Sequence, residues 1–263
     1  MKLAALLLLA GSLQAEVTYD RIVKAASEPQ SWLTYQGDYG AMRHRELNQI
    51  NDTNVKNLRV EWMYQTGVRG AFETVPIVAD GVMYITAGDG MAMALDPKTG
   101  REFWKYKYNM DRDAKLCCGT VNRGLAMLGQ RVFMATPDGH LVALDARTGK
   151  QLWDTQMGDW RKGYGATMAP MVVKDKIIAG VSGGEFGIRG FVDAYDPATG
   201  KQVWRFWTVP DKNQPGGDTW LADSWQRGGG ATWTTGTFDP ALNTLYWPVG
   251  NPGPDLYGES RKG

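Results

Sequence analysis

The feature of this sequence that most constrains its fold is an internal repeat with a period near fifty residues. Three segments align without a gap, each with Asp, Thr-Gly and Trp at the same spacing: "ALDPKTGREFW" at 94–104, "ALDARTGKQLW" at 143–153 and "AYDPATGKQVW" at 194–204. Their final residues, Trp104, Trp153 and Trp204, lie 49 and then 51 residues apart. A period of this size is typical of propellers and solenoids, in which each repeat is one supersecondary unit.

Each repeat predicts a small antiparallel sheet. Apolar runs split by a glycine turn precede the aligned segments, as in "GVMYITAGDGMAMAL" and "RVFMATPDGHLVAL", and suit adjacent antiparallel strands. In the turn that follows, the Asp side chain can accept bonds from backbone amides two residues on, and Gly tolerates positive φ. The next strand ends in Trp, whose ring can pack between one four-stranded blade and the next. We therefore expect an all-β propeller in which these tryptophans separate the blades.

The repeat units do not complete a ring. Upstream of the aligned segments, another polar-to-strand segment ends in Trp62, and downstream "ATWTTGTFDPALNTLYWPVGNPGPD" begins a further unit with its turn at 239–243. Four blades or a little more are expected before the sequence stops at Gly263 in a polar loop. A propeller closes to remove its exposed strand edges. Residues 16–263 are therefore expected to be the N-terminal part of a longer propeller domain.

The first residues, "MKLAALLLLAGSLQAE", predict a secretory signal peptide over 1–15. The apolar run is too short to span a bilayer, which needs about 20 apolar residues. It is also continuous rather than periodic, which argues against the alternative of an N-terminal core helix. We expect export to an oxidising compartment such as a bacterial periplasm.

Composition and charge exclude several functions. The formal net charge is +1, and no basic and aromatic cluster suggests binding of nucleic acid or of an anionic membrane. His44 and His140 are far apart, with no cysteine or acid near either at the spacing of metal ligands. We expect both to be surface or packing residues, and a zinc hydrolase is not supported.

The A-x-D-x-x-T-G-x-x-x-W spacing of the repeats resembles the tryptophan-docking motifs of the pyrroloquinoline quinone-dependent (quinoprotein) alcohol and methanol dehydrogenases. The resemblance runs from about Trp32 to the end of the chain. It implies an eight-bladed β-propeller, of which this chain would hold roughly the first half. Non-catalytic scaffold propellers of the bacterial envelope share a similar signature, so other positions must decide between an enzyme and a scaffold.

Adjacent cysteines in "KLCCGTVNRG" at 115–124 favour the enzyme. In the family, such neighbours form a disulfide that lies against one face of the quinone, which the resemblance implies for Cys117 and Cys118. Consecutive α-carbons are about 3.8 Å apart across a trans peptide, whereas ordinary disulfides span roughly 4.4 to 6.8 Å. The ring would therefore be strained, as functional sites can be. The alternative is a pair of buried free thiols.

Further positions match cofactor contacts of the family. The resemblance places Arg123 near the reactive quinone oxygens, where its charged, planar fork of donors can stabilise developing negative charge. It places Trp233 on the face of the quinone opposite the cysteines. The alternatives are a solvated arginine and a glycine-rich hairpin around 182–184. The full set of expected cofactor-binding residues is Glu73, Cys117, Cys118, Arg123, Thr167, Ser182, Gly183, Gly184 and Trp233.

A metal site is expected from two oxygen donors. The resemblance implies that Glu185, directly after two glycines, and Asn251, in "GNPGPD", are metal ligands, although the second stretch could be only a turn. Carboxylate and amide oxygens suit calcium or a lanthanide and do not suit zinc or copper. The family's general-base aspartate is expected beyond Gly263, so the chain alone should be an incomplete catalyst.

The resemblance implies a periplasmic oxidoreductase that oxidises a primary alcohol, such as methanol or ethanol, to the aldehyde. Hydride would pass from the alcohol carbon to pyrroloquinoline quinone, and electrons would then pass to a cytochrome c. A homodimer or a small accessory subunit is left open, and no nucleic-acid partner is expected. The alternatives are an envelope scaffold propeller and a quinoprotein acting on another polyol or a sugar.

Overall fold

The computed structural model describes residues 16–111, 113–114, 116–255 and 257–259. The signal peptide predicted over 1–15 lies outside the described residues. Within the described part of the chain, no helix is long and apolar enough to cross a membrane.

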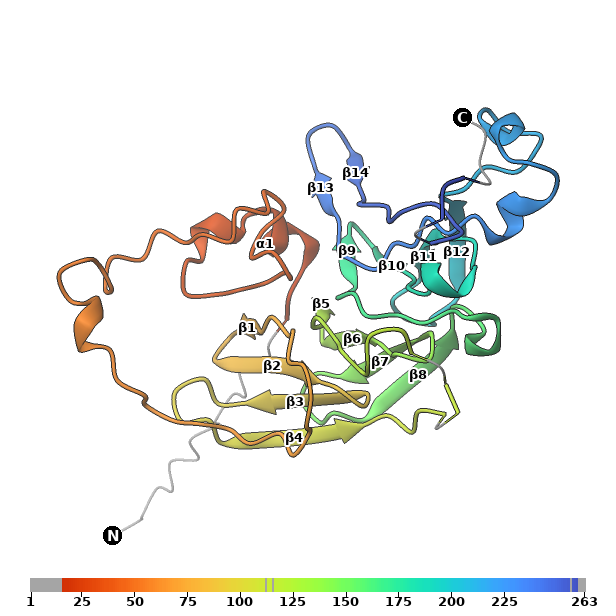
Figure 1. Cartoon of the computed structure of the whole chain (residues 1–263). Helices are drawn as coiled ribbons and strands as arrows, with labels where there is room; N and C mark the ends of the chain where they lie inside the picture. Colours follow the sequence, from red (N-terminus) through yellow and green to blue (C-terminus); the bar gives the residue numbers. More distant parts are fainter. Residues whose placement is uncertain (1–15, 112, 115, 256, 260–263) are drawn as a thin grey trace, which may run out of the picture.

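Three four-stranded antiparallel sheets follow one another along the chain, each with its strands in sequence order (Figure 1). The first contains β1 (Ile77–Ala79), β2 (Val82–Ala87), β3 (Met91–Leu95) and β4 (Glu102–Lys107). The second contains β5 (Ala126–Leu128), β6 (Arg131–Ala135), β7 (His140–Asp145) and β8 (Gln151–Gln156). The third contains β9 (Met171–Val173), β10 (Lys176–Gly180), β11 (Phe191–Tyr195) and β12 (Gln202–Trp207).

A two-stranded hairpin of β13 (Thr237–Asp239) and β14 (Thr244–Tyr246) follows the third sheet. The predicted all-β architecture of propeller blades is confirmed, but the estimate of four blades or more was too high. The described residues form three complete blades and the first hairpin of a fourth. The reason is that each blade requires its two outer strands, and "TFDPALNTLYW" supplies only an inner hairpin.

The remaining regular structure is short. It comprises α1 (Tyr19–Val23) and the 3₁₀ turns η1 (Ala25–Ser27), η2 (Val55–Asn57), η3 (Trp160–Lys162), η4 (Gly184–Phe186), η5 (Gly217–Thr219) and η6 (Ser224–Arg227).

The core lies between the blades and depends on the third strand of each sheet. All of β11 and nearly all of β3 and β7 are buried, whereas the outermost strands β4, β8 and β12 are largely exposed. A strand covered on both faces requires a continuous apolar run, and "MAMAL" and "LVAL" provide it. Tyr84, Phe133 and Phe191 are fully buried in the first, second and third sheets.

The repeated tryptophans join each blade to the next, as predicted. The indole N–H of Trp104 donates to the Ala146 carbonyl at 2.8 Å, and those of Trp62 and Trp153 donate to Pro97 and Pro197, both at 3.1 Å. Each acceptor lies in the D-x-x-T-G turn of the following blade. The turn glycines Gly100, Gly149 and Gly200 lie against the same rings, at φ values of 70°, 71° and 72°.

The aspartates of these turns bond as expected. The Asp196 carboxylate accepts hydrogen bonds from the Ala198 amide at 3.0 Å and from the Thr199 amide and hydroxyl at 2.8 and 2.9 Å. These bonds lower the pKa of Asp196, and the bond from the Thr199 hydroxyl has the largest effect. The Asp145 carboxylate is held in the same way by Thr148.

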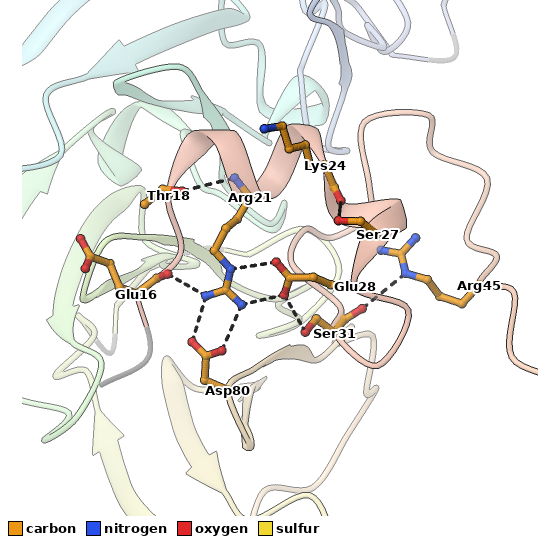
Figure 2. Close-up of polar contacts among 9 residues, drawn as sticks. All are labelled: Glu16, Thr18, Arg21, Lys24, Ser27, Glu28, Ser31, Arg45 and Asp80. Atoms are coloured by element: carbon orange, nitrogen blue, oxygen red, sulfur yellow. Dashed lines mark hydrogen bonds and ion pairs between the residues drawn. The ribbon is translucent and has the colours of Figure 1, made fainter. Parts of the chain in front are cut away.

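The segment that precedes the first blade connects two blades. Val17 pairs with Gly129 in the turn between β5 and β6. Figure 2 shows the Arg21 guanidinium between Glu28, at 2.7 Å, and Asp80 in the turn between β1 and β2, at 2.9 Å. The N-terminal segment therefore fixes the first blade relative to the second. The geometry of the site depends on how these two blades are placed.

Candidate functional site

A cavity of about 210 Å³ lies where the blades meet, and segments outside the strands supply all of its lining residues. These segments come from all three sheets and from the residues around the β13–β14 hairpin. Of the residues predicted from the sequence, the cavity brings together Glu73, Cys117, Cys118, Arg123, Thr167, Ser182, Gly183, Glu185, Trp233 and Asn251. Gly184 is the one predicted residue that is not among its lining residues.

Arg123 contacts the lining residues contributed by the other blades. Its Nη2 lies 2.7 Å from the Glu73 carboxylate, and its Nη1 donates to the Thr167 carbonyl at 3.3 Å. The guanidinium carbon lies 4.9 Å from the Trp233 ring centroid, within the range of a cation–π contact. Only 14% of the Arg123 side chain is exposed. A permanently charged donor fork is therefore held at the cavity wall.

Backbone hydrogen bonds between blades set the position of Arg123. Its amide donates to the Thr167 carbonyl at 3.1 Å, and its carbonyl accepts from the Val75 amide at 3.0 Å. Gly124 follows with φ of 134°, and a Cβ there would lie 2.8 Å from the Val75 carbonyl oxygen. The close approach of these segments thus requires glycine directly after the arginine.

Cys117 and Cys118 both line the cavity, with their sulfur atoms 2.6 Å apart. Both are exposed free thiols in the structure, so the predicted disulfide is not formed in it and stays a prediction. The contact with Cys118, together with partial burial and the nearby Glu185 carboxylate, raises the pKa of Cys117 to about 12. The Cys117 thiol is therefore protonated at neutral pH.

The glycines before Glu185 shape the turn that presents it. Gly183 has φ of 111°, and a Cβ there would lie 1.9 Å from the Gly163 carbonyl oxygen, which only glycine tolerates. Gly184 instead begins η4, and a Cβ there would lie 3.5 Å from the Cβ of Ala231, which is ordinary van der Waals contact.

Asn251 lines the cavity from the segment that follows β14. Its side-chain N–H donates to the Asp255 carboxylate, which leaves the amide oxygen available as a ligand. Carboxylate and amide oxygens form a hard donor set. Across the described ranges, no group of three or more His, Cys, Asp and Glu side chains is placed to hold a metal ion.

Trp233 is positioned by its neighbour Thr232, which is fully buried. The Thr232 hydroxyl donates to the Phe191 carbonyl at 2.6 Å and accepts from the Val181 amide at 2.8 Å. The Trp233 carbonyl accepts from the Thr167 hydroxyl at 3.3 Å. The indole itself is 44% exposed and forms one wall of the cavity. A flat ring on an anchored backbone segment is suited to stacking against a planar ligand.

Three supporting residues were missed from the sequence: Asn122 beside Arg123, Thr232 beside Trp233, and Asp255 near Asn251. The partners of the first two, Ala135 for Asn122 and Val181 for Thr232, are distant in the sequence, whereas Asp255 bonds to Asn251 four residues before it. Adjacency to a matched residue was the only signal for the first two. No spacing rule in a single sequence distinguishes such neighbours from ordinary loop residues.

Comparison with known proteins gives a family match over residues 32–263, to the PQQ-type "Glucose/ethanol/alcohol dehydrogenase, beta-propeller domain". The chain is 41% identical over 92% of its length to the quinohemoprotein alcohol dehydrogenase ADH-IIG of Pseudomonas putida, covering 36% of that protein. It is 40% identical over 97% of its length to a lanthanide-dependent methanol dehydrogenase of Methylacidiphilum fumariolicum (strain SolV), covering 45% of it. The chain thus spans less than half the length of these two relatives.

Solved structures agree. The structure of ADHIIG from Pseudomonas putida HK5 superimposes with a TM-score of 0.87 at 41% identity, over 91% of this chain and 37% of that one. A europium-containing methanol dehydrogenase gives a TM-score of 0.85 at 39% identity, over 89% of this chain and 45% of the other.

Proposed function

The chain belongs to the PQQ-dependent glucose/ethanol/alcohol dehydrogenase family of β-propeller domains, and from this premise we propose that it is part of a periplasmic alcohol dehydrogenase. The proposed enzyme oxidises a primary alcohol, such as methanol or ethanol, to the aldehyde with pyrroloquinoline quinone and a bound calcium or lanthanide ion. Electrons then pass to a cytochrome c.

The observation that carries the proposal is the composition of one cavity. A guanidinium, an indole, two neighbouring thiols, a carboxylate and a carboxamide converge there from separate blades: Arg123, Trp233, Cys117, Cys118, Glu185 and Asn251. A scaffold propeller needs none of these groups at its centre. Polar residues gathered from distant segments into a cavity mark a ligand site.

The cavity fits a planar, polyanionic quinone. The Trp233 ring offers a flat wall, and Arg123 and the hydroxyls of Thr167 and Ser182 can bind carboxylates and carbonyl oxygens. Glycine at position 165 lets this part of the wall pack against Pro137, since a Cβ there would lie 2.6 Å from the Pro137 carbonyl oxygen. When bound, pyrroloquinoline quinone supplies the oxidant that accepts hydride from the alcohol carbon.

The chain's own residues would orient the cofactor and stabilise charge. Arg123, held by Glu73 at 2.7 Å, would donate hydrogen bonds to an oxygen that becomes negative during the reaction. Cys117 and Cys118 would bound the ring on the face away from Trp233, as a disulfide in the oxidising periplasm. We assign no residue of this chain to removal of the alcohol proton.

Glu185 and Asn251 would contribute two oxygen ligands to the metal ion. Calcium takes 6–8 oxygen ligands, so oxygens of the cofactor, water or other residues must complete the set. The carboxylate of Asp255 would keep the Asn251 oxygen turned toward the ion by binding its N–H group.

The test is alcohol oxidation by the full-length protein, measured with an artificial electron acceptor after addition of pyrroloquinoline quinone and calcium or lanthanum. We expect activity that requires the quinone and falls by more than about 100-fold in Glu185→Ala, since a metal ligand is lost. Glu46→Ala, which alters an exposed glutamate outside the cavity, should leave activity unchanged. Alcohol oxidation that does not depend on added quinone, or no alcohol oxidation with either metal, would refute the proposal. A panel of alcohols, polyols and glucose identifies the substrate class.

A further inference from the structure

Asn122 is a buried carboxamide directly beside the Arg123 of the cavity, with 2% of its surface exposed. Its Nδ2 donates to the Ala135 carbonyl at the end of β6 at 2.7 Å. Its Oδ1 accepts from the Gly124 amide at 2.9 Å. Val121 and Arg123 line the cavity and Asn122 does not, so the Asn122 side chain points into the second blade.

The hydrogen bond from the Gly124 amide to the Asn122 side chain closes a ring that contains the backbone of Arg123. An asparagine oxygen that accepts from the amide two residues on forms an Asx turn, which restricts the backbone of the residue between. Here that residue is Arg123. The second bond, to Ala135, ties the turn to β6, a strand of the second blade.

The other restraints on the Arg123 side chain are weaker or lie in the cavity. The Glu73 carboxylate is 37% exposed, and the Thr167 contact is long at 3.3 Å. Both partners line the cavity, where a bound ligand competes for the same groups. The Asn122 bonds are out of reach of a ligand, and in a dry interior they are costly to break.

We propose that Asn122 is a positioning residue: its side-chain bonds act with the backbone bonds of Arg123 to Val75 and Thr167 to hold the guanidinium toward the cavity, with or without the Glu73 contact. Its kinetic consequence rests on the proposed function, whereas its structural consequence does not. Asn122 itself touches neither substrate nor cofactor.

The structural test uses crystal structures of full-length wild-type and Asn122→Ala protein. We expect the Arg123 guanidinium to move by about 1 Å or more from its position 2.7 Å from Glu73, with the blades unchanged. An unmoved Arg123 would overturn the inference. This result holds even if the wild-type protein has no quinone-dependent activity, which would refute the proposed function instead.

The kinetic test is a double-mutant cycle with Arg123→Ala, read as kcat and KM of alcohol oxidation. We expect Asn122→Ala to lower kcat by about 10- to 100-fold with KM changed much less, since small misplacements of a catalytic group have effects of this size. In the Arg123→Ala background the same change should lower kcat less than about twofold. Equal losses in both backgrounds, or no loss in either, would overturn the inference.

Two further variants separate positioning from loss of stability. Tyr39→Phe removes another buried donor to a backbone carbonyl, that of Val172 at 2.6 Å, away from the cavity, and should leave kcat unchanged. Asn122→Asp keeps the acceptor for Gly124 but needs a proton to donate to Ala135. Its kcat relative to wild type should therefore rise as pH is lowered, because burial favours the protonated acid. A kcat that stays low at every pH for a folded Asn122→Asp protein would contradict the inference.

Discussion

At the scale of single residues, the turn glycines explain why the repeat carries Thr-Gly four residues before its Trp. A Cβ at Gly149 would lie 2.7 Å from the Trp104 ring, and the same clash recurs at Gly100 with Trp62. The glycine is needed both for its positive φ and for the space it leaves to the indole of the preceding blade. The tryptophan of one repeat and the glycine of the next therefore pack against each other and form one contact between blades.

Gly149→Ala should lower the free energy of unfolding by about 1–3 kcal/mol beyond the loss caused by positive φ alone, because the added methyl overpacks the Trp104 contact. Gly81→Ala is the matched control, since Gly81 has φ of 78° with no atom within 4 Å of its Cβ position. Denaturant unfolding of the full-length variants measures the difference. Equal losses in the two variants would show that the ring contact is unimportant.

His140 gives the fold a pH dependence. Its Nδ1 lies 2.8 Å from the Asp154 carboxylate, and this bond, with the charges of Asp154 and Asp138, raises the pKa of His140 above 6.5. The folded state thus binds the proton more tightly than the unfolded state. The resulting stability is present below pH 6.5 and is lost as pH rises through the higher folded-state pKa.

As pH rises above 6.5 we expect the free energy of unfolding to fall, because the contribution of this group is lost. Equilibrium unfolding in wild type and in His140→Gln measures its share. The fall should be smaller in the variant. If the two proteins lose stability in parallel over this range, the ion pair with Asp154 does not contribute.

At the scale of elements, residues 58–66 occupy the place of an outermost blade strand although they pair with no strand among the described residues. Trp62 docks on the first blade as Trp104 docks on the second. The Tyr64 hydroxyl bonds to Glu102, just as the Tyr106 hydroxyl bonds to Gln151 at 2.6 Å. Trp62 and Tyr64 thus make the same kinds of contact with the first blade as Trp104 and Tyr106 make with the second.

This equivalence predicts that residues 58–66 form the outer strand of a further blade in the full-length protein. Hydrogen exchange read by mass spectrometry should find their amides protected about as well as those of β4 (102–107), since both would be paired in a sheet. Exchange as fast as that of the exposed stretch 46–54 would contradict the prediction.

At the scale of the whole molecule, the sequence predicted the blades and the tryptophan contacts between them, but not the other contacts that join distant segments. The repeat fixed where strands and turns fall, because the D-x-x-T-G turn and the alternating runs are local signals. The site residues were matched through a family resemblance, and ten of them line one cavity. The packing of the N-terminal segment against Asp80 and Gly129, and the Asn122 bond to Ala135, depend on long-range geometry that no local pattern carries.

The architecture also explains why the site lies where it does. Every lining residue lies outside the strands, before β1, between strands or after β14, and neighbouring segments are hydrogen-bonded across blades, as from Val75 to Arg123 and from Arg123 to Thr167. The rigid sheets carry the stability, and the connecting segments carry the chemistry.

The most direct test of the central claim is a crystal structure of the full-length protein with pyrroloquinoline quinone and calcium or lanthanum. We predict that the quinone lies in this cavity, stacked on Trp233 with Cys117 and Cys118 on its other face, and with the metal ion bound by Glu185 and Asn251. A quinone bound elsewhere, or a cavity left without it at saturating cofactor, would contradict the account.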